Sequence, residues 1–225
     1  MSRHVQPPAL VAVASFGAAL ALAATGEARV SMWFAAAAVI AAAVAWLEGG
    51  PDSAKEIAVV ATLAGAAGAG RVLFAAVPGV QPVTVMTIVA GAALGLRAGV
   101  AVGMLAAFAS NFFLAQGPWT PYQMLAWGAC GAAGALLAPL VRGRIALAVT
   151  ACVLGFAFSV FMDVWEWFAF WPHDVRSLVL VVGRGVPFSL AHAIGNFILA
   201  LAVGPELRRL LERYARRLRA EVVWA

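Results

Sequence analysis

The sequence predicts an all-α protein, a polytopic membrane helical bundle, and three observations predict this fold class. First, 64% of the 225 residues are hydrophobic and only 11% are charged, whereas soluble domains have roughly 45–50% apolar and about 25% charged residues. Second, the apolar residues form runs close to the length of about 20 residues that a membrane-spanning helix needs. Third, the low charge excludes an intrinsically disordered chain.

Eight apolar runs follow one another along the chain, and residues typical of turns separate them. The breaks include Gly49-Gly50-Pro51-Asp52, Pro78-Gly79, Gly117-Pro118 and Pro172. The fourth run is short for a full span. We expect helical spans at residues 9–24, 31–47, 57–76, 83–96, 98–115, 121–141, 145–169 and 178–204.

The distribution of Lys and Arg predicts the orientation, because cytoplasmic segments of membrane proteins carry an excess of these residues. With a cytoplasmic N-terminus, eleven of the 15 basic residues lie inside and four lie outside or in the outer part of a helix. The four are Arg29, Arg71, Arg176 and Arg184. We therefore expect a multi-pass protein of the cell membrane with a cytoplasmic C-terminus. Alternatively, residues 1–28 are a cleaved signal peptide, which removes one span and leaves the tail inside.

The C-terminal segment is a basic amphipathic tail. Leu207, Leu210, Leu211, Tyr214 and Leu218 recur at helical spacing, and arginines fill most of the remaining positions. A helix on the anionic cytoplasmic leaflet is our preferred interpretation, and a solvated charged helix is the alternative.

No catalytic signature, metal motif or cofactor motif is present in the sequence. There is no phosphate-binding glycine loop, no His-Glu-x-x-His and no nucleophile elbow. Cys130 and Cys152 lie inside apolar runs and are expected to be small buried hydrophobes. The net charge of +5 follows from topology, so no nucleic-acid partner is expected.

Polar side chains gather at the predicted outer ends of the spans, which indicates a binding pocket that opens to the outside. A polar group inside a span needs a partner or a function, because it is costly to bury in lipid. Ordinary explanations compete: an interfacial tryptophan belt, hydrogen bonds between helices, or an ion pair of Asp163 or Glu166 with Arg184 or Arg176. The candidate ligand-binding residues are Gln81, Thr84, Asn111, Gln116, Trp119, Gln123, Trp127, Asp163, Glu166, His192 and Asn196.

Small residues recur every four positions in the third run, and such spacing lets helices approach closely in lipid. In an alanine-rich chain the pattern also arises by chance. The two stripes are Ala58, Thr62 and Ala66, and Ala61, Gly65 and Ala69.

Three segments resemble the substrate-binding S components of energy-coupling factor (ECF) vitamin transporters. The resemblance covers roughly residues 55–215, and the block around Asn111 and Gln116 is its most specific part. The segments are Gly70-Arg71-Val72-Leu73-Phe74 through Val80-Gln81-Pro82-Val83-Thr84; Ser110-Asn111-Phe112-Phe113-Leu114-Ala115-Gln116-Gly117-Pro118-Trp119-Thr120-Pro121-Tyr122-Gln123-Met124; and Ala191-His192-Ala193-Ile194-Gly195-Asn196 followed by Gly204-Pro205.

The resemblance implies a six-helix core at residues 53–205, preceded by two additional spans in 1–52 and followed by the cytoplasmic tail, 206–225. It implies a non-enzymatic subunit that captures a vitamin or related micronutrient at the outer face. Its partners would be a membrane T component and two ATPase subunits, which hydrolyse the ATP. The two small-residue stripes would face the T component. A cobalamin-like ring compound is our first expectation, and thiamine, biotin, riboflavin and a queuosine precursor remain open.

Two other functions compete with the transport subunit. The first is an intramembrane enzyme that uses Asp163, Glu166, His173, Asp174 and His192 as an acid–base or metal site. The second is a non-transporting scaffold subunit, which predicts that the outer polar residues pack together without a cavity.

Overall fold

The computed structural model describes residues 7–25, 27–48 and 54–222, and all regular structure in these ranges is helical. The predicted all-α fold is therefore confirmed for this part of the chain. Arg3 and the predicted break at 49–52 lie outside the described residues. The helices are α1 (Pro7–Ala24), α2 (Ala28–Glu48), α3 (Ala54–Leu73), α4 (Val83–Leu94), α5 (Leu96–Leu114), α6 (Thr120–Leu136), the 3-10 helix η1 (Leu140–Arg142), α7 (Arg144–Phe170) and α8 (Val175–Val222).

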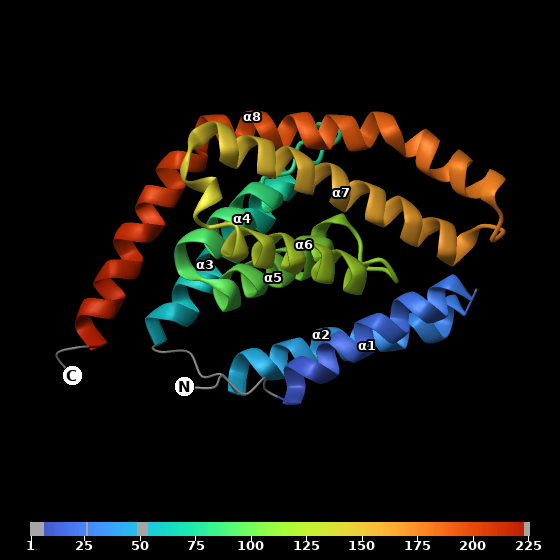
Figure 1. Ribbon diagram of the computed structural model, residues 1–225, viewed down its shortest axis with the longest axis horizontal. Coiled ribbons are helices and arrows are strands. Elements are labelled where there is room, and N and C mark those ends of the chain that lie inside the picture. Colours follow the sequence, from blue (N-terminus) through green and yellow to red (C-terminus); the bar gives the residue numbers. More distant parts are fainter. Residues whose placement is uncertain (1–6, 26, 49–53, 223–225) are drawn as a thin grey trace.

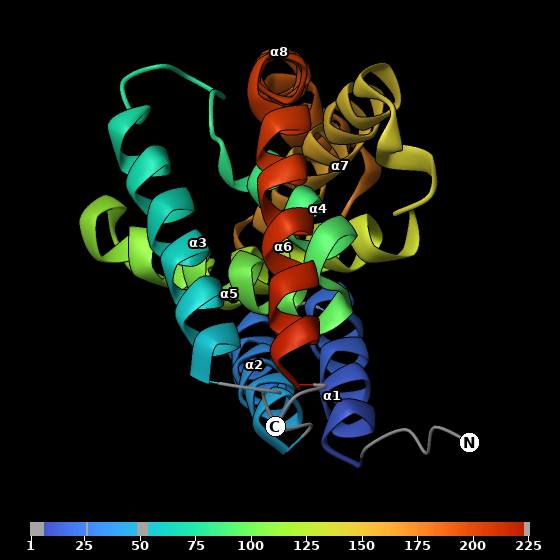
Figure 2. The same ribbon diagram turned by 90° about the vertical axis from the view of Figure 1, so that its left-hand side faces the viewer.

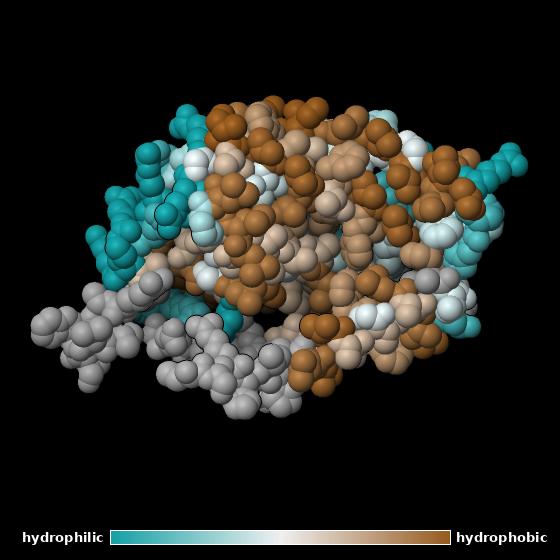
Figure 3. All heavy atoms as spheres, viewed as in Figure 1, coloured by the Kyte–Doolittle hydropathy of each residue, from teal (hydrophilic) through white to brown (hydrophobic). Residues whose placement is uncertain are grey.

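Four of the described helices are long and apolar enough to cross a membrane, namely α3, α5, α7 and α8. Figure 3 shows a hydrophobic band across the middle of the molecule, with hydrophilic residues gathered toward its left and right ends. A lipid-facing surface has this appearance, because apolar side chains are stable against hydrocarbon and charged ones are not. The helices thus support a helical membrane protein.

The sixth predicted run is longer than the helix it contains. Residues 121–141 were expected to be one span, but α6 ends at Leu136 and η1 follows at Leu140–Arg142. Pro139 lies between them and has no backbone N–H to donate to a continuing helix. The apolar character of residues 121–141 therefore does not show whether they form one unbroken helix.

Helix α8 includes both the eighth predicted run and the basic tail as far as Val222. Figure 1 shows that α8 runs beside α7 and then turns away in its red portion, which contains Pro205. A proline inside a helix removes one hydrogen bond and clashes with the preceding turn, so it favours a kink. The tail therefore leaves the bundle as a bent continuation of the last helix.

Glycines allow α4, α5 and α6 to pack with their backbones in contact. A Cβ atom on Gly131 of α6 would overlap the backbone of Gly99 on α5, and one on Gly91 of α4 would overlap the carbonyl oxygen of Gly131. Figure 2 shows these helices crossing in the interior, with α3 and α7 toward opposite sides. Close approach at small residues is the usual way in which membrane helices gain packing energy.

Helices α1 and α2 pack against each other and contact the other helices at few places. The Ser31 hydroxyl donates to the Ala19 carbonyl oxygen at 2.6 Å and shares a hydrogen bond with the Tyr122 hydroxyl of α6. Phe16 of α1 lies 6.4 Å from Phe161 of α7, measured between ring centroids. The pair lies along one side of the bundle (Figure 2).

Candidate functional site

The structure has an open cavity of about 500 Å³ where the ends of α3 and α5 meet the start of α6 and the last turns of α7. Its lining combines one guanidinium, two carboxylates, two amides and several aromatic rings. The lining residues are Arg71, Asn111, Leu114, Trp119, Gln123, Met162, Asp163, Trp165, Glu166 and Phe170.

Arg71, in the last turn of α3, is the cation of this cavity, and only 7% of its surface is exposed. Its Nε donates to Gln81 Oε1 at 3.2 Å, and its Nη1 donates to Ser110 Oγ at 2.7 Å and to Asn111 Oδ1. Its Cζ atom lies 4.9 Å from the ring centroid of Trp127. All these partners are neutral, and no described carboxylate lies within 4.0 Å of the guanidinium.

A network of amides and hydroxyls fixes the end of α5 to the start of α6. Asn111 Nδ2 donates to Thr120 Oγ1 and to Gln123 Oε1, both at 2.9 Å. Thr120 Oγ1 in turn donates to Gln116 Oε1 at 2.9 Å. Gln116 lies exposed in the connecting loop, where its Nε2 donates to the Phe108 carbonyl oxygen. The amide of Gln123 is thereby oriented while its side chain lines the cavity.

The two carboxylates of α7 differ in their partners. Glu166 forms an ion pair with Arg184 of α8 and accepts a hydrogen bond from Trp171 Nε1 at 3.3 Å. Asp163 has no ion-pair partner among the described residues, and it accepts one long hydrogen bond of 3.5 Å from the Ser189 hydroxyl. The ion pair with Arg184 that the sequence left open for either carboxylate therefore belongs to Glu166.

Aromatic rings form the walls of the cavity. Trp165 packs against Tyr122 at 5.3 Å and meets Phe170 edge-on at 5.7 Å, both measured between ring centroids. Trp119 lies over Gly117, where a Cβ atom would overlap the indole ring. Such rings offer flat apolar surfaces on which a planar ligand stacks.

Four predicted site residues form a separate buried cluster behind the cavity. Trp127 Nε1 donates to Thr84 Oγ1 at 3.1 Å, and the Thr84 hydroxyl lies 3.3 Å from His192 Nε2. His192 Nδ1 donates to the Gly79 carbonyl oxygen at 2.6 Å, since a carbonyl only accepts, and this fixes Nε2 as the acceptor in the neutral ring. Asn196 Nδ2 donates to the His192 carbonyl oxygen, one turn earlier on α8.

Gly79 is essential to the geometry of this cluster. Its φ of 76° lies in the left-handed region, and a Cβ atom there would overlap the backbone of Ala191 and His192. Only glycine satisfies both conditions. The loop between α3 and α4 therefore reaches α8 closely enough to hold the His192 ring.

The structure thus divides the eleven predicted residues into three groups. Five line the cavity: Asn111, Trp119, Gln123, Asp163 and Glu166. Gln81 accepts a hydrogen bond from the lining residue Arg71, and Gln116 accepts one from Thr120, which itself accepts from the lining residue Asn111. Thr84, Trp127, His192 and Asn196 are buried in the cluster behind it.

Sequence reasoning assigned Arg71 to topology and did not include it among the site residues. The signal was present, because a lone arginine within the outer part of an apolar helix needs a partner or a function. The aromatic residues Trp165 and Phe170 were also missed as lining residues. They lie in a stretch rich in tryptophan, where an interfacial belt explains each ring equally well.

All six residues of the predicted docking stripes are exposed on α3: Ala58, Ala61, Thr62, Gly65, Ala66 and Ala69. The opposite face of the helix is buried and contains Val60, Leu63, Ala64, Ala67, Gly68 and Arg71. Both stripes therefore lie on the side of α3 that faces away from the bundle.

In the described part of the chain, no three His, Cys, Asp or Glu side chains lie close enough together to hold a metal ion. His173 is exposed and contacts the Phe168 carbonyl oxygen, while His192 belongs to the buried cluster. Among the described residues suggested for an intramembrane site, only Asp163 and Glu166 line the same cavity. Cys130 is buried, Cys152 is half-buried, and both are free thiols.

Comparisons with known proteins give one family. A model described as a family of unknown function (DUF6580) matches residues 51–209. No curated protein and no solved structure matches the chain.

Proposed function

We infer that this chain, which belongs to a family of unknown function (DUF6580), is a membrane-embedded subunit whose cavity binds a small micronutrient-class ring compound. The finer proposal is that of an S component of an ECF-type importer, with a six-helix core at 53–205 and two additional N-terminal spans. In this proposal the cavity faces outward and the tail is cytoplasmic. A T component and two ATPase subunits supply transport energy.

One observation carries the proposal: the cavity contains two oppositely charged groups, and neither forms an ion pair with a described residue. Arg71 is buried among neutral hydrogen-bond partners, and Asp163 is half-buried with one long hydrogen bond. Unpaired charges in a membrane protein are costly and mark functional sites by default. A ligand with a basic centre and a hydrogen-bond acceptor or anion would pair its basic centre with Asp163 and its acceptor or anion with Arg71.

The volume of the cavity narrows the ligand class. About 500 Å³ lies in the lower half of the range of roughly 300–1,000 Å³ for drug-sized ligands. This size favours a compound of one or two rings over a corrinoid macrocycle. We therefore rank a basic heterocycle of the thiamine or queuosine-precursor kind ahead of a cobalamin-like ring.

The exposed stripes of α3 support the transport aspect of the proposal. Small side chains on an outward helix face leave the backbone accessible to a partner helix. α3 also supplies Arg71 to the cavity, so the same helix would link ligand to partner. The open cavity favours a binding protein over a scaffold whose polar residues only pack together.

The test is a thermal-shift panel of vitamin-class compounds on the purified full chain. A ligand that binds only the folded state at 100 times its Kd stabilises it by about 2.7 kcal/mol, which is a clear rise in melting temperature. Asp163→Asn should weaken binding of the active compound at least about tenfold, because a hydrogen bond to a charged group contributes about 1.5–3 kcal/mol.

The matched control is Glu206→Gln, which removes one exposed carboxylate from α8 outside the cavity. It should leave the affinity within about twofold, since mutations at distant sites act independently. If no compound in the panel raises the melting temperature, or if both variants weaken binding equally, the proposed cavity site is wrong.

A further inference from the structure

A second cavity, of about 520 Å³, lies at the opposite end of α7, where the connection from α6 meets α8. It is lined by Arg142, Arg144, Pro205, Arg208, Arg209 and Glu212. On α7 the first cavity at Glu166 lies 22 residues from Arg144, ~33 Å along the helix. This separation matches the hydrocarbon thickness of roughly 30 Å, so the arginine cavity lies at the other membrane surface.

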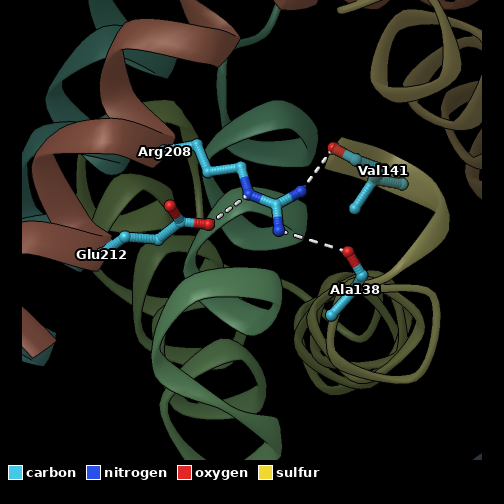
Figure 4. Close-up of polar contacts among 4 residues, drawn as sticks. All are labelled: Ala138, Val141, Arg208 and Glu212. Carbon is cyan, nitrogen blue, oxygen red and sulfur yellow. Dashed lines mark hydrogen bonds and ion pairs between the residues drawn. The ribbon is translucent and has the colours of Figure 1, made fainter. Parts of the chain in front are cut away.

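Arg208 lines this cavity, and all three of its guanidinium nitrogens donate hydrogen bonds within the protein. Figure 4 shows its guanidinium between Glu212 and the carbonyl groups of Ala138 and Val141. Nε donates to Glu212 Oε1 at 2.7 Å, and Nη2 donates to the Ala138 carbonyl oxygen at 3.2 Å. Arg208 thereby holds α8 against the α6–α7 connection, next to the bend at Pro205. The other α8 arginine that lines the cavity, Arg209, forms an exposed ion pair with Glu206.

Arg142 and Arg144 have no such partners. Both side chains are exposed, and neither forms an ion pair or hydrogen bond with a described residue. They flank Gly143, the N-cap of α7, which provides no side-chain cap. The first turn of α7 contains no acidic residue either. The free backbone N–H groups and positive dipole at this helix start add to the charge of the two arginines.

Exposed apolar side chains adjoin these two arginines. Leu140 is 59% exposed and Ile145 is 64% exposed, and they adjoin Arg142 and Arg144 in the chain. A soluble anion gains nothing from these side chains. A lipid has both an anionic phosphate for the arginines and acyl chains for the leucine and isoleucine.

We propose that the arginine cavity binds the headgroup phosphate of an anionic phospholipid, with Arg142 and Arg144 as the ligand-binding residues. Arginine binds phosphate through paired, charge-assisted hydrogen bonds, and helix N-termini bind phosphate through backbone N–H groups. Basic cavities at the cytoplasmic ends of membrane helices recognise lipid headgroups, and the charge distribution predicts that this end is cytoplasmic.

The experiment measures the melting temperature of the full chain in neutral detergent with added dioleoylphosphatidylglycerol, dioleoylphosphatidylcholine or inorganic phosphate. Native mass spectrometry counts the lipids that remain bound. We expect phosphatidylglycerol alone to raise the melting temperature. The variant R142Q/R144Q should bind it at least about tenfold more weakly, because charge-assisted hydrogen bonds are lost.

The matched control R213Q/R217Q removes two charges from α8, outside the cavity, and should bind within about twofold of the unchanged protein. Equal weakening by both variants would mean a diffuse electrostatic field and would overturn the site. Protection by inorganic phosphate equal to that by phosphatidylglycerol would overturn the lipid assignment in favour of a soluble anion. Absence of any protection, or a large fall in the lipid-free melting temperature of R142Q/R144Q, would also overturn it.

Discussion

Thr84 is the residue on which the buried polar cluster depends, because its hydroxyl contacts side chains from two other helices. It accepts from Trp127 of α6 and lies beside the acceptor nitrogen of His192 on α8. Trp127 also stacks on Phe158 of α7 at 4.2 Å between ring centroids. One hydroxyl therefore links α4, α6 and α8, and the guanidinium of Arg71 lies over the Trp127 ring of the same cluster.

The substitution Thr84→Val should destabilise the protein by about 1–3 kcal/mol, because it leaves the Trp127 N–H and the His192 Nε2 buried without partners. Thermal unfolding in detergent measures this loss. The matched control is Thr62→Val on the exposed face of α3, where the hydroxyl donates only to the Ala58 carbonyl oxygen. The control should change stability by no more than about 0.5 kcal/mol. Equal effects of the two substitutions would contradict the role of the cluster.

The sequence predicted many residues of the candidate site, but not which of them line the cavity and which lie in the buried cluster behind it. Asp163 and Glu166 were equivalent in sequence, and only the packing of α7 on α8 gives the ion pair to Glu166 and leaves Asp163 without an ion-pair partner among the described residues. Similarly, Trp119 and Trp127 were both predicted to be ligand-binding residues. The structure places the first in the cavity wall and the second in the buried cluster.

At the scale of helices, hydropathy predicted the elements well because each span must be apolar and each break needs turn residues. Helices α3 to α7 begin and end within about five residues of the predicted runs. The break after Leu136 and the continuation of α8 into the tail were not predicted. Both depend on backbone hydrogen bonding around Pro139 and Pro205, to which hydropathy is insensitive.

A substitution at Gly131 tests the close crossing of α4, α5 and α6. Gly131→Ala should destabilise the protein by about 1–3 kcal/mol, since the added methyl group overlaps the Gly99 backbone and overpacks the interior. Gly65→Ala on α3 is the matched control, because nothing lies within 4 Å of a Cβ atom there. The control should be neutral or slightly stabilising. Chemical denaturation or thermal unfolding compares the two, and a neutral Gly131→Ala would refute the close crossing.

At the scale of the whole molecule, the proposed activities occupy three separate surfaces. The ligand cavity and the arginine cavity lie at opposite ends of α7, and the small-residue stripes lie on the outward face of α3. Figure 1 shows the α7–α8 connection at one end of the bundle and the bent tail of α8 toward the other. Binding and partner docking should therefore be separable by mutation.

The double substitution A58L/A66L should abolish uptake of the compound identified by the thermal panel while leaving its affinity unchanged. Two bulky side chains on α3 prevent the close helix approach that small residues permit, but they lie outside the cavity. Uptake is measured in the native cells, and affinity is measured on the purified chain. A157L/A202L, on exposed positions of α7 and α8, is the control and should retain both. Normal uptake by A58L/A66L would rule out this face of α3 as the docking surface.

The sequence by itself determined the membrane class, the positions of most helices and the end of the bundle where polar residues gather. These properties follow from composition and from periodic hydropathy, which the bilayer enforces locally on each segment. The tertiary structure decided which polar groups face a cavity, which satisfy one another in the interior, and which charges remain unpaired. Those properties depend on contacts such as Arg71 with Asn111 and Thr84 with His192, which lie 40 and 108 residues apart in the chain. No local pattern encodes such contacts, because helix packing alone brings these residues together.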